Sequence, residues 1–136
     1  LEKYLHTEKT NPILIECGLI HSQFETIHPF LDGNGRIGRL IITFLLCTNN
    51  IISKPVLYLS YYFKKYRNDY YNKLMGVRNN GEWEAWLKFF LNGIIEVSDN
   101  AITLSNKIIE LQKRNSGLIH KSFPRASNKI ISLLEK

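Results

Sequence analysis

Apolar residues recur at intervals of three and four along most of this chain. A first series consists of Ile13, Cys17, Ile20, Phe24 and Ile27. A second series consists of Ile37, Leu40, Ile41, Phe44 and Leu45. This spacing places apolar side chains on one face of an α-helix. The two series predict helices over about 12–27 and about 35–49, and the first helix has a start signal in Asn11 followed by Pro12.

The rest of the chain has the same period. A third series consists of Phe63, Tyr66, Tyr70, Leu74 and Val77, and it predicts one helix over about 60–78. A longer series between Trp83 and Leu111 predicts one long helix, or two helices with a bend near Gly93. We expect 1–8 to be the end of a helix and 55–59 to be short and extended. The pattern as a whole predicts an all-α fold.

Turn-forming residues predict how the chain is organised. We expect a core over 1–114, and Gly117 and Pro124 predict a linker over 115–126. Residues 127–136 predict the start of a further helix. The first residue is Leu1 rather than Met, so we expect the sequence to be a piece of a longer chain.

Composition narrows the class of protein. The 136 residues are 44% hydrophobic and 12% aromatic, which suits one compact domain with its own core. There is no apolar run of membrane-spanning length and no secretion signal, so we expect a cytoplasmic protein without a membrane partner. Cys17 and Cys47 lack metal or redox spacing and are expected to be reduced core residues. The net charge of +6 favours an anionic partner such as a nucleotide or a nucleic acid.

The stretch between the first two predicted helices, residues 28–39, reads HPFLDGNGRIGR. Its GNGRIG portion matches the G-x-G-x-x-G pattern of dinucleotide-binding and kinase loops. A dinucleotide loop follows an apolar strand and has an acid about twenty residues later, and neither is present. The further motifs of a kinase are missing, and so is the Gly-Lys-Ser/Thr of a P-loop. The glycine pattern alone therefore assigns none of these sites.

The stretch nevertheless has the chemistry of a phosphate site. Gly33 and Gly35 permit turns that direct successive N–H groups at one point, and the start of a helix adds the positive end of its dipole. Arg36 and Arg39 are three residues apart and emerge on the same side of that helix. Cations at a helix N-terminus are normally unfavourable, and a bound polyphosphate would reverse this penalty. The alternative is a capped helix start with two solvated arginines.

Two neighbouring side chains fit the same chemistry. Asp32 could hold Mg²⁺ beside phosphate oxygens, or it could simply cap the following helix. His28 could accept a proton from a hydroxyl, or it could be a structural histidine. Glu25 and His28 also have the Glu-x-x-His spacing of di-iron bundles, but those need two such pairs. We therefore expect Glu25 to be a surface or supporting residue.

These residues resemble the signature of Fic (filamentation-induced-by-cAMP) domains, His-Pro-Phe-x-Asp/Glu-Gly-Asn-Gly-Arg-x-x-Arg, at every specified position. The preceding SQFETI at 22–27 and the downstream PVLYLS at 55–60, Tyr70-Tyr71 and GEWEAW at 81–86 also resemble bacterial members. The resemblance covers about 1–111. It implies an all-α helical bundle with the signature loop between two core helices.

The same resemblance implies an enzyme that transfers AMP from ATP to a Tyr, Thr or Ser hydroxyl of a protein target and releases pyrophosphate. His28 would be the general base, and Asp32 would hold Mg²⁺ against the phosphates. The backbone at Gly33, Asn34 and Gly35 would cradle these phosphates.

The remaining roles implied by the resemblance are supporting ones. Arg36 and Arg39 would neutralise the leaving pyrophosphate. Phe30 would be a buried plug that fixes the loop, and Pro29 would stiffen its approach. Tyr70 and Tyr71 would lie near adenosine, although either could be ordinary aromatic packing.

Several alternatives stay open. Members of the Doc type, which phosphorylate, have lysine in place of the second signature glycine, so Gly35 favours AMP transfer. Transfer of UMP or phosphocholine, and nucleotide binding without transfer, remain compatible with the signature. In the family, a hairpin flap that aligns the target and often an inhibitory helix lie upstream, and we expect both outside this sequence. A homodimer is compatible with the pattern, and nucleic acid would be a partner only if a winged helix begins near residue 127.

Overall fold

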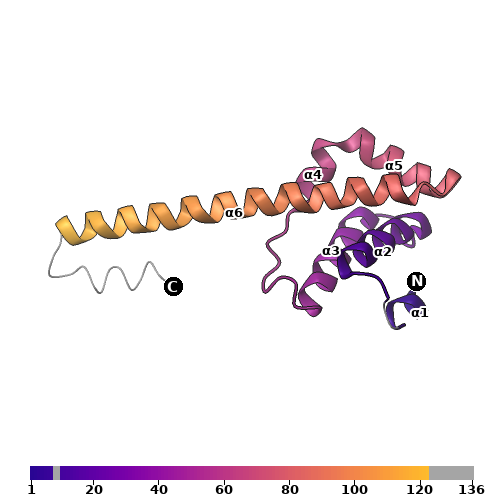
Figure 1. Ribbon diagram of the computed structural model, residues 1–136, viewed down its shortest axis with the longest axis horizontal. Coiled ribbons are helices and arrows are strands. Elements are labelled where there is room, and N and C mark those ends of the chain that lie inside the picture. Colours follow the sequence, from indigo (N-terminus) through magenta and orange to yellow (C-terminus); the bar gives the residue numbers. More distant parts are fainter. Residues whose placement is uncertain (8–9, 123–136) are drawn as a thin grey trace. The chain divides into compact units, whose positions relative to one another are not determined.

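The computed structural model describes residues 1–7 and 10–122 (Figure 1). Within them the regular structure is entirely helical, which confirms the predicted all-α class. The elements are α1 (Glu2–Leu5), α2 (Ile13–Ile27), α3 (Asn34–Thr48), α4 (Leu59–Lys65), α5 (Arg67–Asn80) and α6 (Trp83–Ser122). The further helix predicted over 127–136 lies outside the described residues.

The chain divides into two units, 1–98 and 99–136. The boundary falls within α6, earlier than the end of the expected core at residue 114. Residues 115–122 are helical, whereas the sequence predicts a linker there. No helix in the described part of the chain is both long and apolar enough to cross a membrane.

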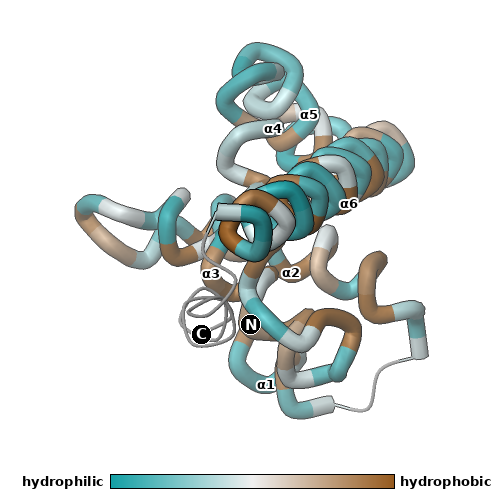
Figure 2. The backbone as a smooth tube through the Cα atoms, turned by 90° about the vertical axis from the view of Figure 1, so that its left-hand side faces the viewer, coloured by the Kyte–Doolittle hydropathy of each residue, from teal (hydrophilic) through white to brown (hydrophobic). Residues whose placement is uncertain are grey.

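The first unit is built around a core to which α2, α3, α4, α5 and α6 all contribute. α2 and α3 pack side by side and are joined by the short segment 28–33 (Figure 1). Trp86 and Phe90 of α6 are fully buried, and the indole Nε1–H of Trp86 donates a 2.8 Å hydrogen bond to the Gly18 carbonyl of α2. This bond satisfies the one polar atom of a large buried side chain. Figure 2 shows that α6 carries both hydrophobic and hydrophilic residues.

Two details of the helix pattern depend on tertiary contacts. The single helix predicted over 60–78 is wrong, because the chain leaves helical geometry at Tyr66 (φ −109°, ψ 44°) and forms α4 and α5 instead. The Tyr66 ring lies 4.8 Å from the Tyr62 ring, and its hydroxyl donates a 3.3 Å hydrogen bond to Glu96 of α6. Of the two alternatives for the region after Trp83, the structure has the one long helix.

Gly93 allows α6 to pack closely on α4. A Cβ at this position would lie 2.6 Å from Cδ1 and 2.7 Å from Cε1 of Tyr62. The Tyr62 ring is buried and contacts the Phe63, Tyr66 and Phe89 rings, so it has little room to move.

We predict that Gly93→Ala lowers the free energy of unfolding of the first unit by about 1–3 kcal/mol, because overpacking outweighs the gain in helix propensity. Urea unfolding followed by the fluorescence of Trp83 and Trp86 measures this change. Gly117→Ala is the matched control, since nothing lies within 4 Å of a Cβ there and the residue is also in α6. Equal unfolding midpoints for the two variants would contradict the prediction.

Candidate functional site

His28 ends α2 in an unusual backbone conformation. Its φ of 49° and ψ of 57° lie in the left-handed region, and its N–H donates a 3.0 Å hydrogen bond to the Phe24 carbonyl. A residue other than glycine in this region carries a cost on the order of 1 kcal/mol, and such residues cluster at functional sites. The conformation turns the chain sharply out of α2 into Pro29.

The imidazole of His28 is held by one nitrogen and open at the other. Nδ1 lies 3.3 Å from the Glu25 carbonyl oxygen, and the side chain is 58% exposed. A carbonyl oxygen can only accept a hydrogen bond, so this contact places the proton on Nδ1. Nε2 then carries the lone pair and is able to accept a proton from a hydroxyl.

The beginning of α3 has unpaired backbone donors. Gly33 precedes the helix with φ of 83°, and no side chain caps this end. The first helical bond runs from the Ile37 N–H to the Gly33 carbonyl, 3.0 Å away. The N–H groups of Asn34, Gly35 and Arg36 have no hydrogen-bond partner among the described residues. Together with the helix dipole, they form a favourable position for an anion.

The Asn34 side chain fixes the loop before α3. It is buried, its Oδ1 accepts a 2.9 Å hydrogen bond from the Phe30 N–H, and its Nδ2 donates to the Phe30 carbonyl. The family resemblance implies a buried plug at Phe30, but Phe30 is 49% exposed, and its ring lies 6.4 Å from the Phe24 ring. The loop is therefore held through the backbone of Phe30 rather than through burial of its ring. Pro29 is exposed beside it.

The two arginines differ in their surroundings. Arg36 forms an exposed 3.3 Å ion pair with Asp32, and such a pair contributes at most about 1 kcal/mol, so both groups are easily released to a ligand. Arg39 is partly buried and lies close to Gly35, where a Cβ would come within 3.1 Å of its Nη1. A side chain at Gly35 would therefore require the Arg39 guanidinium to shift slightly, while only Gly33 of the two glycines has a left-handed backbone.

The surroundings of Asp32 suit one of the two common ways of holding Mg²⁺. No group of three or more His, Cys, Asp or Glu side chains in the described residues could hold a metal by itself. Mg²⁺ commonly takes only one or two carboxylates and completes its shell with water and phosphate oxygens. The exposed Asp32 carboxylate, beside the unpaired amides of α3, fits this second arrangement.

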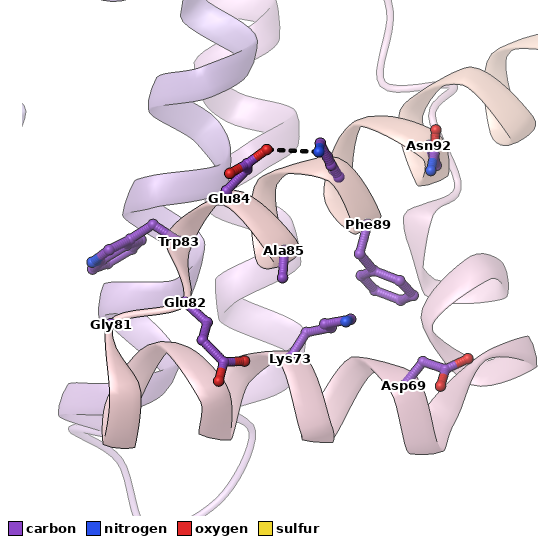
Figure 3. A pocket seen from close by; sticks show the side chains of 10 residues that line it. Asp69, Lys73, Gly81, Glu82, Trp83, Glu84, Ala85, Phe89 and Asn92 are labelled. Carbon is purple, nitrogen blue, oxygen red and sulfur yellow. Dashed lines mark ion pairs between the residues drawn. The ribbon is translucent and has the colours of Figure 1, made fainter.

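Two pockets flank the loop. One, of about 440 Å³, is lined by residues of α2 and α5 that include Glu25, His28 and Tyr71. The other, of about 330 Å³, is lined by Arg36 and Arg39 of α3 and by residues of the segment 55–60. A larger pocket of about 790 Å³ between α5 and the start of α6 contains none of the predicted site residues (Figure 3). Its lining has both signs of charge, including the 2.6 Å ion pair of Glu84 and Lys88.

The two adjacent tyrosines lie in different environments. Tyr71 is exposed and lines the pocket that contains His28. Tyr70 is buried, and its hydroxyl lies 3.0 Å from Nε2 of His21. Burial raises the pKa of the Tyr70 hydroxyl, which therefore remains a hydrogen-bond donor. The structure brings Tyr71, and not Tyr70, into the pocket that His28 lines.

Below the loop lie polar residues to which the sequence pattern assigned no role or only a supporting one. His21 is completely buried, and its ring stacks with those of Phe63 and Trp86. Burial lowers the pKa of His21 to about 4. Glu25 is mostly buried as well. Positions 21, 25 and 28 share one helical face, and this spacing is the signal that could have linked the first two to His28.

Comparisons with known proteins agree with this geometry. Residues 1–46, which include the whole signature loop and most of α3, match the Fic/DOC family. This segment belongs to the Fic/DOC family.

Curated relatives of the Fic segment were found in several organisms. A probable protein adenylyltransferase of Aquifex aeolicus is 40% identical over 50 residues, which are 37% of this chain and 16% of that protein. A Fido domain-containing protein of Dictyostelium discoideum is 43% identical over 44 residues, 32% of this chain and 30% of that protein. The protein adenylyltransferase Fic of Drosophila grimshawi is 32% identical over 90 residues, 65% of this chain and 17% of that protein. The chain therefore spans less than a third of the length of these relatives.

The first prediction for the signature loop concerns Asn34. We predict that Asn34→Ala lowers the free energy of unfolding by about 1–3 kcal/mol, because the Phe30 N–H and carbonyl lose their partners. Urea unfolding measures the change. Asn68→Ala is the control, because Asn68 is exposed on α5. A midpoint for Asn34→Ala equal to that of the control would disprove the role of Asn34 in holding the loop.

The second prediction concerns the stability of the fold at acidic pH, which depends on His21. The His21 pKa is about 4 in the folded chain and 6.5 at its ordinary value, so between these pH values the unfolded chain binds a proton that the folded chain does not. The free energy of unfolding should therefore fall as the pH drops from 6.5 to 4, by up to about 3 kcal/mol from this residue.

The comparison of wild type with His21→Phe isolates this contribution. Phenylalanine keeps an aromatic ring between Phe63 and Trp86 but does not titrate. Urea unfolding at several pH values should show a shallower loss for His21→Phe, and His6→Gln, at an exposed histidine, should behave as wild type. Glu25, whose pKa is raised by burial, contributes with the opposite sign in all three proteins. Parallel pH curves for wild type and His21→Phe would contradict the prediction.

Proposed function

We propose that this chain carries the catalytic core of a protein adenylyltransferase, which transfers AMP from ATP to a hydroxyl group of a protein target. One observation carries the proposal: an exposed histidine with a free Nε2 ends α2, and the next helix begins six residues later with unpaired amides and two arginines. The names of the relatives, protein adenylyltransferases in Aquifex aeolicus and Drosophila grimshawi, support the same reaction.

The reaction needs a base and a phosphate cradle on adjacent elements. Nε2 of His28 accepts the proton of the target hydroxyl, and the hydroxyl oxygen attacks the α-phosphorus of ATP. A new P–O bond forms to the target, the bond between the α-phosphorus and the bridging oxygen breaks, and pyrophosphate leaves. Positioning and neutralisation of charge are the main contributions that a protein makes to such a transfer.

The charges of this chain are placed for the leaving group. The N–H groups of 34–36 bind phosphate oxygens, and the guanidinium groups of Arg36 and Arg39 bind the departing pyrophosphate. Arg36 leaves its weak pair with Asp32 to do so. Mg²⁺ at Asp32 would add positive charge against the phosphates.

The pocket beside His28 is the proposed position of the adenine ring. Tyr71 offers an aromatic face there, and stacking of a base on an aromatic side chain is a common source of affinity for nucleotides. The buried Tyr70 lies next to this pocket, with its ring 5.2 Å from the ring of Tyr71.

The test follows label from ATP onto protein. The chain is incubated with ATP labelled on the α-phosphate, Mg²⁺ and a cell lysate, and the labelled protein is quantified. We predict labelling by the wild type and a decrease of about 10²- to 10⁴-fold for His28→Ala, because the general base is lost. His120→Ala, at an exposed histidine in the second unit, should label as wild type.

Each other outcome has a defined meaning. Label from γ-labelled but not α-labelled ATP would replace AMP transfer by phosphoryl transfer. Label from UTP or a phosphocholine donor alone would assign another transfer reaction of the same site. Bound ATP without label from any donor would leave a nucleotide-binding module.

A further inference from the structure

Glu25 is a charged residue whose burial needs an explanation. Its side chain is only 12% exposed, and Oε1 is buried without a hydrogen-bond partner among the described residues. A buried carboxylate without partners is costly, so it persists where nearby charges or a function compensate for the cost. Burial raises the Glu25 pKa, while the neighbouring charges of His28 and Arg39 act to lower it.

The carboxylate lies between the side chains of His28 and Arg39. Oε2 is 4.0 Å from Nδ1 of His28, one turn further along α2. On the other side, a Cβ at Gly35 would be 3.8 Å from Oε1 of Glu25 and 3.1 Å from Nη1 of Arg39. The carboxylate and the guanidinium thus approach the same point of α3, although no ion pair closes between them in the described residues.

A second glycine of α3 makes room for this carboxylate. A Cβ at Gly38 would lie 2.7 Å from Oε1 of Glu25 and 3.1 Å from Nδ1 of His21. Gly38 has ordinary helical geometry, so its backbone conformation gives no reason for a glycine there. The absence of a side chain at this position is what lets the Glu25 carboxylate lie against α3.

We propose that Glu25 is a positioning residue of the transfer site, whose carboxylate orients His28 through Nδ1 and balances the positive charge that His28 gains when Nε2 takes the target proton. This inference rests on the proposed function. The backbone carbonyl of Glu25 already receives Nδ1–H, and the carboxylate adds a full negative charge on the same side of the ring. A carboxylate behind a histidine base serves the same purpose in Ser-His-Asp triads.

The charge also affects Arg39. The Glu25 carboxylate lies near this guanidinium, and the charge of Arg39 acts to lower the Glu25 pKa. Phosphate oxygens of ATP compete for the same guanidinium. Removal of the Glu25 charge should therefore leave ATP binding unchanged or make it tighter, while the chemical step becomes slower.

Glu25→Gln tests this separation, because glutamine keeps the shape and removes the charge. We expect the rate of label transfer at saturating ATP to fall about 10- to 100-fold, with the Kd for Mg·ATP equal to or below that of the wild type. Glu16→Gln is the matched control, since Glu16 is a buried glutamate of α2 that contacts Tyr4 and Asn11. Glu16→Gln should lower the stability of the fold, but it should not slow label transfer while leaving the Kd for Mg·ATP unchanged. A parallel loss of rate and affinity in Glu25→Gln, or a rate equal to that of Glu16→Gln, would overturn the proposal.

A spectroscopic measurement decides the same point without the reaction. The ¹⁵N shifts of the His28 ring report which nitrogen carries the proton. Glutamine can donate its amide N–H to Nδ1, so Glu25→Gln should move the proton from Nδ1 towards Nε2, and Glu16→Gln should not. Unchanged His28 shifts in Glu25→Gln would overturn the positioning role. If the wild type transfers no label, the proposed function fails, and the ring shifts still decide whether Glu25 orients His28.

Discussion

The site depends on the sharp reversal of the chain between α2 and α3. The two helices pack against each other, and the six residues between them must reverse the chain. His28 at φ 49° and Gly33 at φ 83° supply the two left-handed turns. The Asn34 side chain then closes the loop by bonding to both backbone groups of Phe30. This geometry sets the end of one helix, with its histidine, beside the start of the next, with its free N–H groups.

The polar residues under the loop show how the core of the first unit serves the site. His21 lies among aromatic rings and is kept neutral by burial, while Tyr70 bonds to it. Glu25, one helical turn above His21, keeps a carboxylate in a space that Gly38 leaves open. Burial of each of these polar groups costs free energy. Together they form a fixed polar environment next to the His28 ring and the Arg39 guanidinium. The groups proposed to face the ligand, His28, Arg36 and Asp32, stay exposed and weakly paired.

The helical residues of the two units differ in how far their apolar side chains are buried. In the first unit, every helix from α2 onward contributes apolar side chains to one core. In the second, the described helical residues 99–122 are largely exposed, among them Ile102, Leu104 and Leu118. The first unit holds every residue of the proposed site.

The sequence by itself predicted most of the helices and a phosphate-binding chemistry for the loop, because both depend on residues that are close together in the chain. Apolar spacing predicted α2 and α3, and it predicted α6 as one of two alternatives, because a helix repeats every few residues and its buried face is visible in the pattern. The glycines, arginines and histidine of 28–39 predicted a phosphate site, because their chemistry is carried within twelve residues. The break at Tyr66, the exposure of Phe30, the burial of Tyr70 and the carboxylate of Glu25 between His28 and Arg39 were decided by the tertiary structure alone. The break at Tyr66 and the burial of Tyr70 involve contacts between residues far apart in the chain, Tyr66 with Glu96 and His21 with Tyr70, and no local period encodes such contacts.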